Sequence, residues 1–199
     1  MNKKYVLLII IIFTNQLLSN QLDKLNLPEG FKISIFADEL DSPRQITETT
    51  EGFIIVGSKN GDSIFAVYDE DNDGVAEKKI PIASGLMNPT GVTYHKKNLY
   101  FAEIEKVWMI KNIDSWLNSA REKPPKIEIY IDNLPSETWH GFRHIRFGPD
   151  NKLYLPIGVP CNVCIEPQTK DKRFAAIHKY ENGELVMVAD GVRNSVGID

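Results

Sequence analysis

The sequence has no extended basic run, and this absence excludes one large class of partner. Its 23 lysines and arginines are outnumbered by 27 aspartates and glutamates, which gives a net charge of −4. Basic clusters such as Lys78-Lys79 and Lys96-Lys97 are only dipeptides. Without a basic field, nucleic acid is not expected as a partner. Hydrophobic residues make up 42% of the chain, which is enough for a globular core and argues against disorder.

A long apolar run is also missing. Lys3-Lys4 precede an unbroken apolar stretch from Tyr5 to Phe13 that continues weakly to Leu18, whereas a membrane-spanning helix needs ~20 apolar residues. A basic start followed by a short apolar run is typical of a secretory signal. We therefore expect residues 1–20 to be a signal for export to the periplasm. No clean small-x-small cleavage site is present, so an uncleaved N-terminal anchor stays open as an alternative.

Cysteine is scarce, and the two cysteines present, Cys161 and Cys164, lie three residues apart. In an exported protein such a pair is expected to form a disulfide. Haem attachment is disfavoured because Ile165 stands where a histidine should follow. A zinc site is disfavoured because no second Cys/His pair occurs at ligand spacing. A structural disulfide is therefore favoured, with a redox-active pair as the alternative.

Helical patterns are scarce as well. The one convincing helical stretch is Ile113 to Arg121, which ends before Lys123-Pro124-Pro125. Alternating apolar residues predict a half-buried strand over Phe31 to Ala37. Two apolar runs, Ile145 to Phe147 and Leu153 to Ile157, flank a Gly-Pro-Asp-Asn-Lys turn and predict a β-hairpin. Antiparallel strands at this density exclude a doubly wound parallel sheet.

One pattern recurs along the chain. Similar segments begin at Leu40, Leu86, Leu134 and Val192, and the earlier copies are followed by short strands separated by turns. Repeats of ~40–50 residues with four strands each indicate the blades of a β-propeller. The sequence therefore predicts an all-β fold in which residues 21–199 hold about three blades and the start of a fourth. A two-sheet sandwich is the structural alternative. Because a propeller closes with 4 to 8 blades, we expect the sequence to be the N-terminal part of a longer protein.

In a propeller, the loops that precede the innermost strands converge at one end of the central channel. These loops carry cationic, amide and imidazole side chains, which suit an anionic, oxygen-rich ligand, and a histidine there can take a proton from a hydroxyl. The residues are Arg44, Gln45, Asn88, His140, Arg193 and Asn194. Alternatively, His140 is a loop histidine without function, and Arg193 pairs with a carboxylate such as Asp190 or Asp199. We expect His144, four residues after His140, to pack rather than to react.

An acidic segment from Asp69 to Glu77 begins like a calcium-binding loop. Asp69, Asp71, Asp73 and Glu77 occupy ligand positions 1, 3, 5 and 9. Position 12 is Ile80 rather than a bidentate glutamate. The segment predicts a surface calcium site, with an acidic solvated turn as the alternative.

Several motifs together carry a resemblance. They are Trp139-His140-Gly141, the hairpin from Ile145 to Tyr154, the segment from Gly158 to Cys164, and Gly191 to Gly197. In combination they resemble the soluble quinoprotein glucose/sorbosone dehydrogenase family, over about Leu27 to Asp199. The resemblance implies a six-bladed propeller that holds pyrroloquinoline quinone (PQQ) and calcium, oxidises a sugar or a related alcohol or aldehyde hydrate, and passes electrons to an external cytochrome or quinone.

The resemblance also implies roles for individual residues. His140 matches the catalytic histidine that removes the hydroxyl proton while hydride passes to the quinone. Arg193 and Asn194 match a pair that binds the quinone oxygens, and Asn88 matches a polar cofactor contact. Trp139 stands where some family members have a carboxylate, so substrate choice is expected to differ. Further cofactor and calcium contacts are expected beyond Asp199, so we expect residues 1–199 alone to be inactive.

Two other functions stay open. One is a calcium-dependent lactonase on the same architecture, with Asn88 and Asn194 as metal ligands, although no glutamate stands at an equivalent repeat position. The other is a non-catalytic exported propeller that binds a glycan or a partner protein. The second predicts no affinity for the cofactor, whereas a dehydrogenase requires it.

Overall fold

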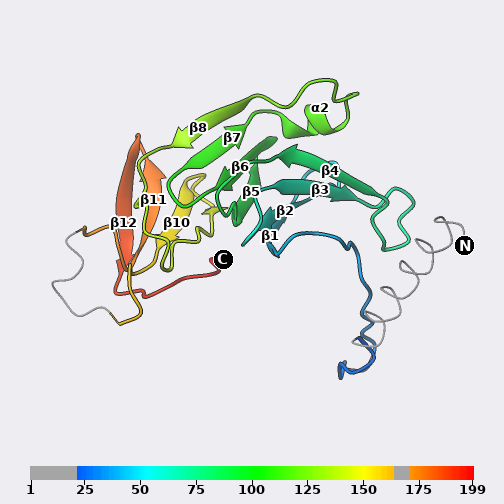
Figure 1. Cartoon of the computed structure of the whole chain (residues 1–199), viewed down its shortest axis with the longest axis horizontal. Coiled ribbons are helices and arrows are strands. Elements are labelled where there is room, and N and C mark those ends of the chain that lie inside the picture. The colour runs from blue at the N-terminus through cyan, green and yellow to red at the C-terminus, as the bar shows by residue number, and fades with distance from the viewer. Residues whose placement is uncertain (1–21, 164–170) are drawn as a thin grey trace, which may run out of the picture.

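The computed structural model describes residues 22–163 and 171–199, and its strands form three four-stranded antiparallel sheets (Figure 1). The first sheet contains β1 (Pro43–Glu48), β2 (Ile54–Ser58), β3 (Ile64–Tyr68) and β4 (Lys78–Ala83). The second contains β5 (Gly91–His95), β6 (Asn98–Ala102), β7 (Val107–Ile110) and β8 (Ile127–Ile131). The third contains β9 (Arg146–Phe147), β10 (Leu153–Ile157), β11 (Ala176–Glu181) and β12 (Glu184–Asp190).

The three sheets are consecutive blades of a β-propeller. Within each sheet the strands follow one another in chain order. Contacts between sheets run from β1 to β5 and from β5 to β9, so the first strand of each sheet is the innermost one. In Figure 1 the sheets fan around a common centre, near which the C-terminus lies. The predicted all-β propeller is confirmed, and the two-sheet sandwich is wrong.

Apolar side chains fill the two spaces between neighbouring sheets. The first cluster joins the first and second sheets and includes Ile55, Ile64, Leu99 and Phe101. The second joins the second and third sheets. Its fully buried members are Ala102, Val107, Ile145, Leu153, Leu155 and Ile157. Short apolar strands therefore pack on both faces of the second sheet, which explains why their sequences read as runs rather than as strict alternation.

A single side chain joins the innermost strands of all three sheets. Gln45, on β1, donates its Nε2 hydrogen to the carbonyl of Ile145 at 2.8 Å. Its Oε1 accepts the backbone N–H groups of Val92, on β5, and of Ile145, just before β9, both at 3.3 Å. These bonds satisfy backbone groups that cannot pair within their own sheets. We call this set of bonds the Gln45 clasp.

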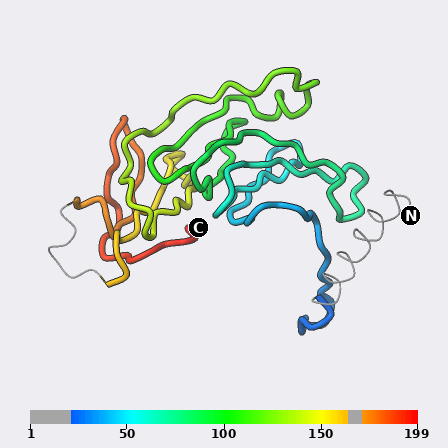
Figure 2. The backbone as a smooth tube through the Cα atoms, in the orientation of Figure 1, coloured from blue at the N-terminus to red at the C-terminus, as the bar shows by residue number. Residues whose placement is uncertain are grey.

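Residues Phe31 to Ala37 do not form the predicted strand. The segment lies apart from the sheets (Figure 2), and Phe31 is 70% exposed. A hydrogen bond from the Ala76 N–H to the Phe36 carbonyl, at 2.7 Å, joins it to the loop between β3 and β4 of the first sheet. The apolar residues of this segment do alternate, but a strand also needs a neighbouring strand to pair with. Among the described residues, none lies beside this segment.

Two other elements differ from the prediction. Helix α2 spans Ile113–Leu117 and ends four residues before Arg121. Ser119 ends it by donating its hydroxyl to the carbonyl of Trp116, and Arg121 has a positive φ of 54°. Residues 191–199 form no strand, so the predicted start of a fourth blade is present only as an extended segment beside Val159, whose N–H donates to the Arg193 carbonyl.

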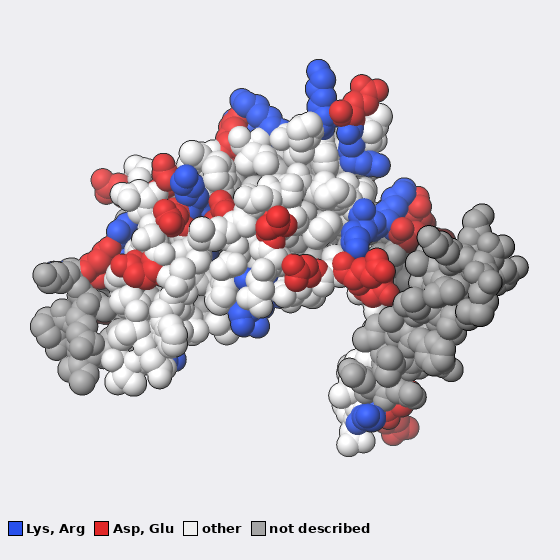
Figure 3. All heavy atoms as spheres, viewed as in Figure 1, with Lys and Arg blue, Asp and Glu red and all other residues white. Residues whose placement is uncertain are grey.

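Charged side chains of both signs are interspersed over the face seen in Figure 3. This agrees with the absence of a basic field from the sequence. Among the described residues, no helix is long and apolar enough to cross a membrane. The predicted signal segment, residues 1–20, lies outside the described residues.

A histidine is buried in the third sheet. His178 lies on β11 opposite Leu155 and is 2% exposed. Its Nδ1 has no hydrogen-bond partner among the described residues. Burial, and after it the charge of Arg173, lowers the pKa of His178 below its usual value, although Asp171 acts in the opposite direction. His178 is therefore neutral in the folded protein near pH 7.

The Gln45 clasp makes a prediction about stability. Gln45→Met keeps the side chain's length but removes all three hydrogen bonds, which leaves backbone groups of Val92 and Ile145 without partners. We expect the free energy of unfolding, measured by urea denaturation, to fall by about 2 kcal/mol. Asn118→Ala, at an exposed site after α2, serves as the control and is expected to change it by less than ~0.5 kcal/mol. An unchanged urea midpoint in Gln45→Met would show that the clasp adds no stability.

His178 makes a prediction about pH. Because its pKa is lower in the folded protein than the usual ~6.5, the unfolded chain binds the proton first as the pH falls. Stability is therefore lost below about pH 6.5, at up to ~1.4 kcal/mol per pH unit for this one group. The variant His178→Leu should lose less stability than the wild type between pH 7 and pH 5. Parallel curves of unfolding free energy against pH would contradict this account.

Candidate functional site

Four of the six predicted ligand residues, Arg44, Gln45, His140 and Asn194, meet in a cavity of about 240 Å³ at one end of the innermost strands. Residues from all three sheets line it, and we call this cavity the mouth. The lining residues are Arg44, Gln45, Lys59, Thr90, His140, Phe142, His144, Asn194 and Val196. None of them is a carboxylate. The cavity is smaller than the ~300–1,000 Å³ of most small-molecule sites, so it suits one sugar ring better than a sugar and a cofactor together.

His140 is held in one tautomer. Its Nδ1 lies 2.9 Å from the carbonyl oxygen of Val159. Because a carbonyl only accepts, Nδ1 must carry the hydrogen, and the neutral ring then keeps an unprotonated Nε2. His140 also has a positive φ of 50°, a backbone conformation that is uncommon outside glycine and often found at functional sites. The arrangement suits a base that takes a proton at Nε2.

Gly158, at the end of β10, lets the His140 loop and the C-terminal segment approach each other. A Cβ atom at position 158 would lie 2.6 Å from the His140 Cβ and 3.2 Å from the carbonyl oxygen of Arg193. The next residue, Val159, accepts from the His140 ring and donates its N–H to the Arg193 carbonyl at 3.0 Å. The backbone at Gly158-Val159 therefore sets the position of His140 relative to Asn194.

A buried arginine fixes the loop that carries His140 and His144. Arg143 is 1% exposed, and it donates from Nε to the carbonyl of Ile104 and from Nη2 to that of Pro135, at 3.0 and 2.7 Å. Burial lowers its pKa to about 10. It is still charged at neutral pH. The two bonds tie the loop to the second sheet and to the segment after β8.

His144, which was expected to pack or to support the site rather than to react, lines the mouth. It is only partly buried. Burial, and then the charges of Arg146 and Arg44, lowers the pKa of His144 below its usual value. At neutral pH it is therefore a neutral polar group in the mouth.

Two predicted cofactor residues do not line the mouth. Asn88 lines a separate cavity together with Asp62 and Glu103. The guanidinium of Arg193 turns away to Asn162, where Nη2 donates to the backbone and the side-chain oxygens at 2.9 Å each. Of the predicted Arg-Asn pair, Asn194 alone faces the mouth. The amide of Gln45, which was also expected to bind a ligand, is taken up by the clasp.

Sequence reasoning missed Lys59, although a signal for it was available. The prediction used only the residues before each innermost strand. In an antiparallel hairpin the end of the second strand lies beside the start of the first, and Pro43 does pair with Ser58. Lys59 must therefore lie near Arg44. Its ammonium lies 5.4 Å from the centre of the Phe142 ring.

The predicted disulfide lies at the edge of the described residues. Cys161 is in a disulfide and does not titrate. Cys164, the expected partner, lies outside the described residues, so the pairing itself stays a prediction.

The acidic turn after β3 brings its carboxylates together. Ligand oxygens of Asp69, Asp71, Asp73 and Glu77 all lie within 4.8 Å of one another. The backbone wraps around Asp69, whose two oxygens accept the N–H groups of Asn72 and Gly74 at 2.7 and 2.9 Å. The turn therefore has the oxygen donors that calcium prefers.

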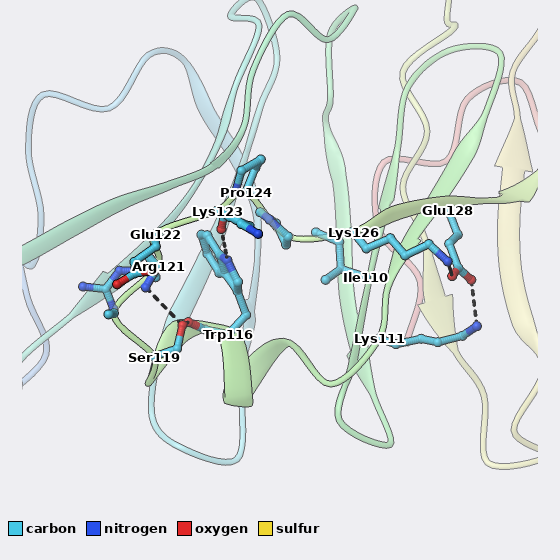
Figure 4. A pocket seen from close by; sticks show the side chains of 12 residues that line it. Ile110, Lys111, Trp116, Ser119, Arg121, Glu122, Lys123, Pro124, Lys126 and Glu128 are labelled. Carbon is cyan, nitrogen blue, oxygen red and sulfur yellow. Dashed lines mark hydrogen bonds and ion pairs between the residues drawn. The ribbon is translucent and has the colours of Figure 1, made fainter.

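A second hollow, of about 560 Å³, lies far from the mouth at the outer edge of the second sheet (Figure 4). Trp116 lies across it and donates its indole N–H to the carbonyl of Lys123. The positive charge of this hollow is partly neutralised, because its residues Lys111 and Lys126 both form ion pairs with Glu128, at 2.7 and 2.8 Å. Those contacts lower the pKa of Glu128 to about 2. No predicted site residue lies in this hollow.

Comparison of sequences gives one relative at a significant level. The chain is 33% identical over 183 residues to an uncharacterized protein of Borreliella burgdorferi. The match takes in 88% of this chain and 46% of that protein, so the chain spans about half the length of this relative. No protein-family model matches the chain.

Comparison of structures supports the fold. The PQQ domain of pyranose dehydrogenase from Coprinopsis cinerea aligns with a TM-score of 0.71 at 16% identity, over 87% of this chain and 44% of that domain. A Trichoderma reesei protein of carbohydrate-active enzymes family AA12 aligns with a TM-score of 0.63 at 15% identity, over 78% of this chain and 39% of that one. At such identities the likeness shows a shared propeller fold and no more.

Proposed function

We propose that the chain is part of a PQQ-dependent dehydrogenase that oxidises a hydroxyl of a sugar or a related alcohol or aldehyde hydrate. The observation that carries this is the mouth itself, in which the free Nε2 of His140 shares a cavity with Asn194 and two cations. The sequence resemblance and the fold shared with a PQQ domain support the same reading. Fold alone would not suffice, because one fold serves many functions.

The residues of the mouth fit an anionic quinone. PQQ carries carboxylates and quinone oxygens, so it needs cations and hydrogen-bond donors. The side-chain amide of Asn194 supplies such a donor, the mouth is positively charged, and none of the residues described as lining it is a carboxylate that would repel the cofactor. When bound, PQQ supplies a two-electron acceptor. The cavity of about 240 Å³ holds only part of such a site, so further surface must complete it.

In this proposal the protein's own part of the reaction is proton transfer. His140 accepts the hydroxyl proton at Nε2, and the Nδ1–H bond to Val159 stabilises the imidazolium that results. Asn194 orients oxygen atoms by donating from its side-chain amide, which has no hydrogen-bond partner among the described residues. Phe142 and Val196 give the cavity apolar walls that limit water.

The calcium ion that the resemblance implies beside the cofactor does not fit the described residues. Calcium prefers carboxylate and carbonyl oxygens, whereas the described lining of the mouth contains no carboxylate. We therefore derive no step through calcium at the mouth. The lactonase alternative meets a similar difficulty, because Asn88 and Asn194 line different cavities.

Export, the electron acceptor and the inactivity of the isolated chain remain part of the proposal. A disulfide at Cys161 is what an oxidising compartment such as the periplasm allows. An external cytochrome or quinone would reoxidise the cofactor. The chain spans 44% of the pyranose dehydrogenase PQQ domain, so we expect residues 1–199 alone to show no turnover. A non-catalytic binding module would instead show no affinity for PQQ.

The catalytic role of His140 predicts a specific kinetic defect. In the complete protein, His140→Gln should lower kcat for PQQ-dependent sugar oxidation by ~10²–10⁴-fold, because a positioned base is lost. The dissociation constant of PQQ should change little. His95→Gln is the matched control, since His95 stacks on Phe147 outside the mouth and should leave kcat unchanged. Equal kcat values in wild type and His140→Gln would contradict the assignment.

We also propose that the turn holding Asp69, Asp71, Asp73 and Glu77 binds calcium as a structural ion. Calcium at a hundred times its Kd should then stabilise the protein by about 2.7 kcal/mol and raise the melting temperature seen by calorimetry. The variant Asp71→Asn should lose most of this shift, whereas Glu51→Gln, at an exposed turn in the same sheet, should keep it. The same melting temperature with calcium and with a chelator would sink the calcium site.

A further inference from the structure

Two cations in the mouth have no anionic partner. Among the described residues, neither Arg44 nor Lys59 forms an ion pair, and no carboxylate lines the cavity they share. The Lys59 ammonium lies over the ring of Phe142. A charge without an ion-pair partner destabilises the folded protein unless it stays hydrated or binds a ligand of opposite charge.

Among the described residues, two arginines of the third sheet are ion-paired, unlike Arg44. Arg146, two residues after His144, pairs with Asp199 at 2.5 Å. Arg173 pairs with Asp171 at 2.6 Å. The two cations that line the mouth, Arg44 on β1 and Lys59 just after β2, both belong to the first sheet.

The two cations and the base line the same cavity but come from different sheets. Pro43 pairs with Ser58, and the Lys59 N–H donates to the Ser42 carbonyl at 2.9 Å, so Arg44 and Lys59 follow opposite ends of this pair on the first sheet, and both line the mouth. His140 belongs to the loop before β9, in the third sheet, and its Nε2 is free. One small ligand that fills the cavity can therefore place an anionic group against the first sheet and a hydroxyl against His140.

We infer that Arg44 and Lys59 form a carboxylate subsite, and that the sugar oxidised is a sugar acid of the uronate class. This rests on the proposed dehydrogenase function. A guanidinium fork beside an ammonium matches the two oxygens of a carboxylate. Phosphate sites usually add backbone N–H groups at a helix N-terminus, and no helix among the described elements contributes to the mouth.

The carboxylate that binds the two cations could belong to the sugar or to PQQ, and the experiment distinguishes these two ligands. Calorimetry on the complete protein would measure the binding of D-glucuronate, D-glucose and PQQ, each alone. We expect the wild type to bind glucuronate at least about tenfold more tightly than glucose. Arg44→Gln and Lys59→Met should each weaken glucuronate binding about tenfold, as expected for one charged hydrogen bond, and should leave glucose and PQQ within about twofold.

Two control variants are matched in residue type. Arg146→Gln removes an arginine that is already paired with Asp199 outside the mouth. Lys106→Met removes a lysine that lies 5.6 Å over the Trp108 ring, as Lys59 lies over Phe142. Both should bind glucuronate like the wild type. Arg44→Lys keeps the charge and should recover part of the lost affinity.

The outcomes are distinct. Equal binding of glucuronate and glucose by the wild type would overturn the subsite. Weaker PQQ binding in Arg44→Gln and Lys59→Met, with an unchanged glucuronate-to-glucose ratio, would assign the two cations to the cofactor and overturn the sugar acid. Glucuronate binding that depends on both residues would support the subsite even if neither sugar were oxidised with PQQ, in which case only the dehydrogenase function would fail.

Discussion

The side-chain amide of Gln45 is the contact on which the site depends. Its oxygen accepts from, and its nitrogen donates to, backbone groups of the second and third sheets. One residue of β1 therefore fixes how three blades meet at the channel. A blade of a propeller is short and apolar on both faces, and the hydrophobic effect that packs the blades together is non-directional. Directional hydrogen bonds at the centre set the register between blades.

The loop before β9 is held from two sides. The backbone of Ile145 is hydrogen-bonded to the Gln45 side chain, while Arg143 donates to the carbonyls of Ile104 and Pro135. Between these anchors and Val159, His140 keeps a left-handed backbone and a defined tautomer. The polar groups engaged in these bonds build the mouth. Those left without partners among the described residues, on Arg44, Lys59, His144 and Asn194, are the ones that a ligand can use.

Much of the fold follows from the sequence, because repeats and turns are local signals. The three blades begin where the repeat landmarks place them, and the hairpin around Gly148 forms as predicted. Partners far apart in sequence could not be read in the same way. Phe31 to Ala37 has the pattern of a strand but no neighbour, and Gln45 lies 100 residues from Ile145.

The site was predicted in part for the same reason. Loops before innermost strands were expected to converge, and Arg44, His140 and Asn194 do so. Which way a side chain turns depends on partners that a pattern does not show, such as Asn162 for Arg193. Lys59 was within reach of sequence reasoning, because antiparallel pairing places it opposite Ser42, two residues before Arg44.

The central claim is that His140 presents an unprotonated Nε2 to a cofactor bound in the mouth. Nitrogen-15 NMR of the imidazole rings in the complete protein, with His140→Gln to assign the signal, tests it most directly. The account predicts that the neutral ring of His140 carries its hydrogen on Nδ1, and that added PQQ shifts the Nε2 resonance. A hydrogen on Nε2, or a resonance that saturating PQQ leaves unmoved, would contradict it.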